Sequence, residues 1–495
     1  MLLLLACALL TVTYFIQESM NHDRDSLGLT RIQPLENAPP ALAFTTIALG
    51  GFRGLISNIL WIRANDLQDQ DKFFEMAQLA DWITKLEPHF VLVWANQAWN
   101  MAYNISVKFK DYSDRWRWVE AGIELLRDQG LPENPNEPLL YRELGWLFQN
   151  KIGANLDDGN MYYKQQWLNE MSKVFGKKTP NLDELIHPQT QDQTNRARLL
   201  EDHYKMDPVF MKKVDEQYGP LEWRLPEASA VYWGAMGLKK AEENPTKIKT
   251  IDLLTLRRLI YQSMMVSFQR GRLIPNPFNK AIAEFGPNLD IIPKVSYAYE
   301  EAAKEDPPDR DHILSAHRNF LRDAVYFLYE HNRIPEASRW FNYLAEKYPN
   351  KTLLDFTTNS FPRNLTLDEY AVDRTQEDVS DAMSRDRVKS VIEGLLINAY
   401  TCLAGGQDER AAGFKLLANK VQKLYSSNTA PRKDAIPMPP IEQTQRDVLK
   451  GLLDPGHGLP PEVRAVLRSK LGMAAEAEPP APASTNAPPE SVSSR

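Results

Sequence analysis

The chain has 495 residues, of which 25% are charged and 43% apolar, and this balance excludes both a wholly disordered protein and one that crosses a membrane many times. The formal net charge is −7, and the 58 basic residues are spread without a basic block, so nucleic acid is not an expected partner. Only two cysteines occur, Cys7 and Cys402, which excludes a disulfide framework.

The chain opens on an unbroken apolar run from Leu2 to Ile16, and the first charge after it is Glu18. The run is shorter than the ~20 residues that span a bilayer comfortably, so a cleaved signal and a retained anchor are both open. No small-residue cleavage site follows closely, which favours a retained anchor at residues 1–20. We therefore expect a single N-terminal membrane anchor.

From about Ala41 onward the pattern is helical, because apolar residues recur three and four positions apart in segment after segment. One such stripe is Leu321, Ala324, Val325 and Leu328. The stretch from Ala41 to Ile62 is apolar but interrupted by Gly50 and Gly51, so it predicts a pair of core helices, with a re-entrant membrane segment as the alternative. Signals for β-strands are scarce throughout, and the sequence predicts an all-α fold.

Several segments fit a two-helix repeat. In such a repeat, a large residue, a small residue where the two helices cross and a proline that ends the second helix occur at fixed distances from one another in the sequence. The first-helix half of the pattern is carried by Tyr141, Leu144, Gly145 and Phe148, and the second-helix half by Ala337, Phe341 and Pro349. Leu60 and Trp94 head two candidate first helices 34 residues apart, whereas 47 residues separate Trp94 from Tyr141. The repeats are therefore imperfect or carry insertions.

On these residues the chain resembles the tetratricopeptide-like helical repeat superfamily, and it is similar to uncharacterised membrane-anchored bacterial helical-repeat proteins. The resemblance covers residues 53–152, 318–349 and, more weakly, 393–425. It implies a tetratricopeptide-like helical solenoid that binds protein partners. It also implies a location at a bacterial cytoplasmic membrane, with the folded part on the periplasmic or outer side of a single N-terminal anchor. The expected segments are an anchor at 1–20, a linker at 21–40, N-terminal repeats at 41–152, an irregular insertion or capping region at 153–227, C-terminal repeats at 228–425, a linker with a short terminal helix at 426–473 and a disordered tail at 474–495.

No motif for a phosphate-binding loop, a zinc site, a nucleophilic serine or a redox cysteine pair occurs, so no catalytic residue, cofactor or metal is expected. Asp157, Asp158 and Asn160 surround Gly159, but the alternating ligands and the closing glutamate of a calcium loop are missing. These residues predict a solvated turn.

The chain has eleven tryptophans, seven of them between Trp61 and Trp146, and they predict either filling between stacked helices or an aromatic groove. Repeat geometry places residues one and five positions after Leu60, Trp94 and Tyr141 on the inner face of the array. The predicted binding residues are Trp61, Asn65, Trp99, Arg142 and Trp146, with Tyr103 one helical turn beyond Trp99, and the same geometry adds Ala95. We expect a membrane-tethered scaffold or adaptor that holds a protein or peptide, or a glycan. The alternative is a helical-toroid enzyme or glycan-binding protein that stacks sugars on tryptophan and uses two carboxylates.

Overall fold

The computed structural model describes residue 16 and residues 53–176, 178–243, 249–275, 283–354, 359–377, 385–429 and 438–475. Apart from residue 16, the predicted anchor lies outside these residues, as do the linker at 21–40, residues 41–52 of the predicted N-terminal repeats and nearly all of the predicted tail. Within them the chain is almost entirely helical, which confirms the all-α prediction.

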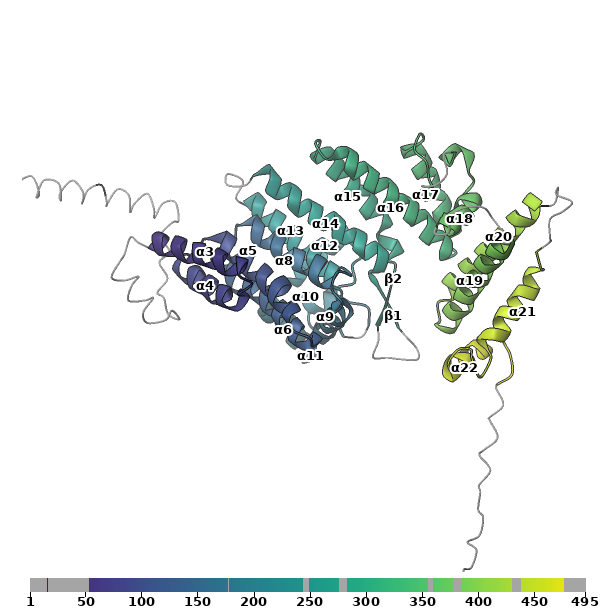
Figure 1. Ribbon diagram of the computed structural model, residues 1–495, viewed down its shortest axis with the longest axis horizontal. Helices are drawn as coiled ribbons and strands as arrows, with labels where there is room; N and C mark the ends of the chain where they lie inside the picture. The colour runs from purple at the N-terminus through teal and green to yellow at the C-terminus, as the bar shows by residue number, and fades with distance from the viewer. Residues whose placement is uncertain are drawn as a thin grey trace, which may run out of the picture.

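The N-terminal part consists of helices that follow one another with short connections (Figure 1). Their bounds are α3 (Arg53–Asp69), α4 (Phe73–Leu86), α5 (Val91–Trp99), α6 (Tyr112–Glu124), α7 (Leu131–Glu133) and α8 (Pro138–Trp146). Three of them continue without a break into wider π-helical turns, which are η2 (Asn100–Ile105) after α5, η4 (Leu125–Gly130) after α6 and η5 (Leu147–Ile152) after α8. A short 3-10 turn, η3 (Ser106–Lys108), follows η2.

Residues 153–227, expected to be irregular, contain short helices separated by loops. They are α9 (Asn160–Phe175), α10 (Asp183–Ile186), α11 (Gln191–Arg198) with the π-helical turn η6 (Leu199–His203), and α12 (Pro208–Tyr218). Tyr163, Trp167 and Met171 recur four residues apart along α9 and are all buried. This region therefore joins the main core, which runs continuously from Trp94 to Leu467.

Among the described residues that follow, one antiparallel hairpin, β1 (Arg272–Pro275) with β2 (Ala283–Gly286), interrupts a succession of helices, and the sequence did not predict it. The helices are α13 (Pro226–Glu243), α14 (Thr250–Arg270), α15 (Ile292–Glu305), α16 (Arg310–Glu330), α17 (Ile334–Lys347), α18 (Leu367–Glu377), α19 (Arg385–Ala404), α20 (Asp408–Thr429), α21 (Ile441–Leu452) and α22 (Pro461–Lys470), with short 3-10 turns η8 (Leu289–Ile291) and η9 (Pro362–Asn364).

Helices adjacent in sequence pack against each other, as in the pairs α3 with α4, α13 with α14, α16 with α17 and α19 with α20. The stripe predicted on α16, from Leu321 to Leu328, is fully buried. Its partner α17 buries Ala337 and Phe341 and ends at Lys347, two residues before Pro349. In this pair the small residue Ala337 and the large residue Phe341 are buried, and Pro349 follows the end of the second helix.

Glycine marks the closest approach between α8 and its neighbours. A Cβ atom on Gly145 would lie 2.5 Å from Leu259 Cδ2 on α14 and 3.3 Å from the Ala230 carbonyl oxygen on α13. Tyr141, Leu144 and Phe148 surround it in the core. Gly145 thus occupies a tight helix crossing, as its place in the repeat pattern predicted.

None of the helices within the described ranges combines the length and the apolar character that crossing a membrane requires.

Candidate functional site

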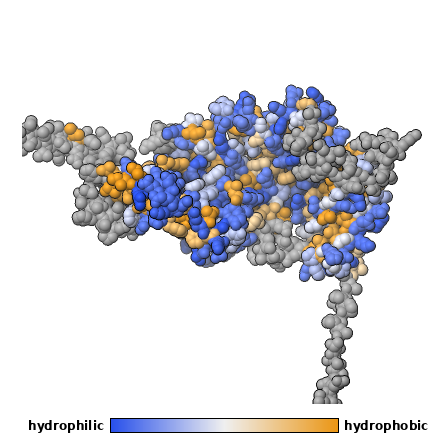
Figure 2. Space-filling view, in the orientation of Figure 1, coloured by the Kyte–Doolittle hydropathy of each residue, from blue (hydrophilic) through white to orange (hydrophobic). Residues whose placement is uncertain are grey.

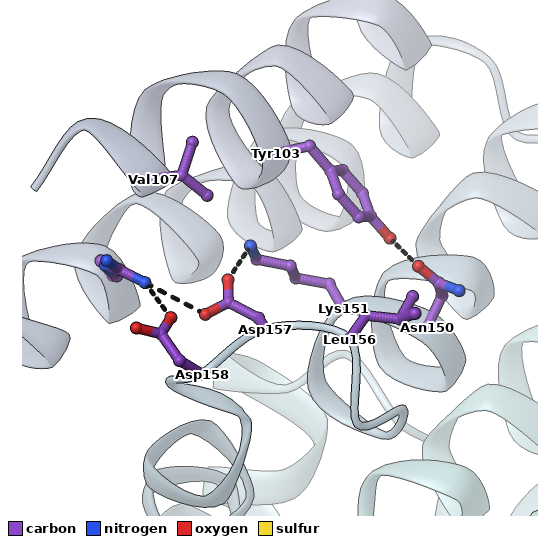
Figure 3. A pocket seen from close by; sticks show the side chains of 8 residues that line it. Tyr103, Val107, Asn150, Lys151, Leu156, Asp157 and Asp158 are labelled. Atoms are coloured by element: carbon purple, nitrogen blue, oxygen red, sulfur yellow. Dashed lines mark hydrogen bonds and ion pairs between the residues drawn. The ribbon is translucent and has the colours of Figure 1, made fainter.

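A pocket of about 400 Å³ opens between the helix formed by α5 and its π-helical continuation and the helix formed by α8 and η5 (Figure 3). The loop that precedes α9 closes its third side. Its lining combines one aromatic ring, two aliphatic side chains and five polar or charged groups. The aromatic ring is Tyr103, the aliphatic side chains are Val107 and Leu156, and the polar or charged groups are Arg115, Asn150, Lys151, Asp157 and Asp158.

The π-helical turns η2 and η5 supply Tyr103, Asn150 and Lys151 to this pocket. A π-turn holds one extra residue per turn, so it rotates the side chains that follow it, and such turns are frequent at functional sites. Buried amides fix both turns. Asn100 donates to the Phe73 carbonyl (3.3 Å), and Gln149 donates to the Leu259 carbonyl (3.0 Å) and to Ser263 Oγ (2.8 Å).

The floor of the pocket is an ion-pair network that is buried apart from Asp158. Lys151 Nζ lies 2.6 Å from Asp157 Oδ2, and both side chains are almost fully buried, with 3% and 8% of their surface exposed. Arg115 reaches Asp157 Oδ1 at 3.2 Å and Asp158 Oδ1 at 2.5 Å. The backbone N–H of Gly159 also donates to Asp157, at 2.8 Å. The charges of two cations and two carboxylates therefore balance within a small volume.

The surroundings shift the ionisation of this network in directions that follow from burial and charge. Burial by itself raises the pKa of Asp157, but the hydrogen bonds from Lys151 and Gly159 outweigh it and hold that pKa at about 2. Burial lowers the pKa of Lys151, and the contact with Asp157 offsets part of that effect. Asp157 is thus held as a carboxylate at neutral pH.

Tyr103 lines the pocket and contacts two tryptophans outside the lining, and we call Trp99, Tyr103 and Trp146 the aromatic face. The rings of Trp99 and Tyr103 stack with their centroids 5.5 Å apart, and 40% of the Trp99 surface is exposed. Tyr103 donates to Asn150 Oδ1 at 2.8 Å, and Lys151 Nζ lies 5.3 Å from the centre of its ring. Trp146 is within hydrogen-bonding reach of Tyr103. Burial raises the pKa of the Tyr103 phenol, so it remains a neutral donor.

Four of the six predicted binding residues therefore lie together. Arg142 forms an ion pair with Glu143, whose charge acts on Tyr103, and this links Arg142 to the aromatic face. The other two lie on α3. Trp61 packs against Phe90, with ring centroids 5.6 Å apart, while Asn65 is exposed. The repeat geometry also assigned Ala95 to the inner face, and this prediction is wrong because Ala95 is buried in the core.

The charged residues of the pocket and Asn150 were not among the binding residues predicted from the sequence. Asp157 and Asp158 were interpreted as a solvated turn, and this is correct for Asp158 but wrong for Asp157, which lies under Arg115 and Lys151. The sequence offered one signal: Lys151 follows a segment with helical apolar spacing and precedes the two aspartates by six and seven positions. Arg115 lies far from them in the chain, and nothing in the sequence connects it to the turn.

Within the ranges that the structure describes, no three histidine, cysteine or acidic side chains are grouped as metal ligands would be. Asp157 already accepts from two cations, which leaves it poorly suited to a further cation. The pocket is better suited to hydrogen-bonding groups and to an apolar side chain.

No family model matches the chain, and a search of curated proteins finds no relative.

Proposed function

We propose that the protein is a membrane-tethered scaffold with a tetratricopeptide-like architecture, and that it holds an extended segment of a partner protein against the aromatic face and the adjoining pocket. The tether is the apolar run from Leu2 to Ile16. By fixing the array at a membrane it raises the local concentration of whatever the array holds.

The arrangement of the helices supports a solenoid. Neighbouring helices pack in sequence order, and Figure 1 shows α3 and α4 at one end of the array and α21 and α22 at the other. Small residues lie at the crossings, as at Gly145 and at Gly122, where a Cβ atom would lie 2.9 Å from the Ala98 carbonyl oxygen. Such an array offers a long preformed surface rather than a closed active-site cleft.

The single observation that carries the proposal is the stacked Trp99–Tyr103 pair at the edge of a pocket with a polar floor. Exposed Val107 and Leu156, the latter with 74% of its surface accessible, border the same pocket. Partly exposed aromatic and aliphatic side chains around desolvated polar groups are typical of the energetic centre of protein interfaces. An extended peptide fits this chemistry, with an apolar side chain in the pocket and backbone amides near Asn150.

The enzyme alternative would need one carboxylic acid that is protonated near neutral pH beside a carboxylate. The buried pocket carboxylate Asp157 is held ionised by Lys151 and Gly159, so it is unsuited to the acid role. The pocket therefore favours binding over glycoside hydrolysis.

The proposal is tested by purifying the full chain from its native membrane after chemical crosslinking and identifying the co-purified protein. Trp99→Ala should reduce the yield of that partner at least roughly tenfold, because central aromatic residues often contribute 2 kcal/mol or more to an interface. Tyr297→Ala is the matched control, because Tyr297 is an exposed aromatic residue on α15.

Two further variants test how far the surface extends. Arg142→Ala should weaken capture, since it releases Glu143 beside Tyr103, and Asn65→Ala should weaken it only if the surface reaches α3. Equal yield from wild type, Trp99→Ala and Arg142→Ala would contradict the proposed surface.

A further inference from the structure

Helix α3 carries an apolar stripe that faces away from the protein. Leu55, Ile59 and Ile62 are 55%, 57% and 62% exposed. They are spaced four and three residues apart, so they share one face of the helix. The opposite face is buried, with Ser57, Ala64 and Leu67 turned toward the protein interior. An amphipathic helix normally buries its apolar stripe, and α3 buries one and exposes a second.

The charges along α3 indicate what the exposed stripe would meet. From Arg53 to Asn65 the helix contains two arginines and no acidic residue, and its acidic residues, Asp66 and Asp69, come only after the stripe has ended. Arg63 lies next to Ile62 in sequence and is exposed. An exposed apolar stripe with an arginine beside it fits the interface of an anionic membrane, because the apolar side chains can insert among the acyl chains while the arginine contacts anionic headgroups.

The position of α3 agrees with that pattern. It lies at one end of the array, and Figure 2 shows apolar surface gathered at that end beside the hydrophilic surface of the neighbouring helix. The 36 residues from 17 to 52 separate it from the apolar run at Leu2–Ile16. A flexible chain of that length would have a root-mean-square end-to-end distance of about 30–36 Å. An anchor in the bilayer would thus hold α3 near the lipid surface.

We propose that α3 lies along the surface of an anionic bilayer, with Leu55, Ile59 and Ile62 inserted at the boundary between headgroups and acyl chains. This contact rests on the proposed membrane tether and adds an orientation to it, since the array would leave the membrane at a fixed angle instead of swinging on a linker. A second copy of the chain is a poorer occupant, because three side chains fall well short of the ~800 Å² per partner that stable interfaces bury.

The test uses the full chain reconstituted into vesicles of phosphatidylcholine and phosphatidylglycerol in equal parts. The photoreactive residue benzoylphenylalanine replaces Ile59 in one sample and Tyr297, which is 63% exposed on α15, in the matched control. After illumination and flotation, mass spectrometry identifies what each position has bound. We expect phospholipid adducts at position 59 to exceed those at position 297 at least about tenfold, because only the former would sit among lipids.

Each outcome bears on one part of the proposal. If the chain floats and position 59 bonds to residues of its own chain, to a second copy or to nothing, the lipid contact is overturned while the tether stands. If the chain does not float, both the tether and the lipid contact are overturned. As a second measurement, Leu55→Gln, Ile59→Gln and Ile62→Gln together should leave flotation intact and increase hydrogen exchange of α3 on vesicles, and unchanged exchange would also overturn the lipid contact.

Discussion

Glu227 provides a quantitative test of how the core is built, because it is a carboxyl group buried inside the array. It is the second residue of α13, only 3% exposed, and its Oε1 has no hydrogen-bond partner among the described residues. Burial raises its pKa to about 7, and its own backbone N–H, Arg270 and Lys164 offset only part of that effect. The folded protein therefore holds a proton on Glu227 that the unfolded chain releases near pH 4.5.

The sign of the resulting pH dependence follows from that difference. Between about pH 4.5 and 7 the folded state binds more protons than the unfolded state, so the free energy of unfolding falls as pH rises. A shift of about 2.5 pH units corresponds to about 3 kcal/mol at 1.36 kcal/mol per unit. The glutamine of Glu227→Gln cannot ionise, so the free energy of unfolding of the variant does not fall with pH through this site. For a folded region of roughly 400 residues, 3 kcal/mol corresponds to about 3–4 °C in Tm.

The assay compares Tm of wild type and Glu227→Gln at pH 4.5 and at pH 8 by circular dichroism. The variant should gain about 3–4 °C relative to wild type between the two pH values. This double difference cancels any fixed cost of burying an amide, and it cancels the titration of Glu330, whose pKa burial also raises to about 7. Glu242→Gln, exposed on the same helix, should show no such change. An identical variant-minus-wild-type Tm at both pH values would refute the reasoning, since it would mean that Arg270 and Lys164 keep Glu227 ionised.

Three other predictions concern packing, the pocket and the tether. Gly145→Leu should lower the free energy of unfolding by ~1–3 kcal/mol, because it overfills the crossing with α13 and α14, and an unchanged Tm would show that the crossing can open. Lys151→Met should cost about 3–5 kcal/mol, because it leaves Asp157 buried with fewer partners, and Lys151→Met with Asp157→Asn should recover part of that loss in the same melt. Deleting residues 1–20 should move the protein from the membrane fraction to the soluble fraction, whereas carbonate-resistant association of the shortened chain would point to the Ala41–Ile62 stretch instead.

The sequence predicted the helices and their crossings well because these depend on local spacing. Apolar residues three and four apart fix a buried face whatever the partner, as Leu321 to Leu328 show. A glycine in the small position of a repeat pattern indicates that two helices approach each other closely, and α8 does approach α13 and α14 closely at Gly145. The helical content of residues 153–227 was underestimated because loops and prolines there interrupt an apolar spacing that continues along α9.

The pocket could be predicted only in part, since its geometry depends on π-helical turns and on contacts distant in sequence. A π-turn differs from the surrounding helix by one extra residue, and no residue type marks it. Asp157 is buried because Arg115 folds over it from 42 positions away. Trp99 and Tyr103 were found because they are four residues apart, and their rings still stack although Tyr103 lies within the π-helical turn η2. Trp61 was assigned to the same surface, but its ring packs on Phe90.

The measurement that tests the scaffold most directly is photocrosslinking from the aromatic face in the native membrane. Benzoylphenylalanine in place of Trp99 should yield one defined protein adduct, and the adduct should map to an extended segment of that partner. The same residue at Tyr297 should not yield it. A protein adduct of equal yield from both positions, or none from Trp99 while the partner still co-purifies with the chain, would contradict the account.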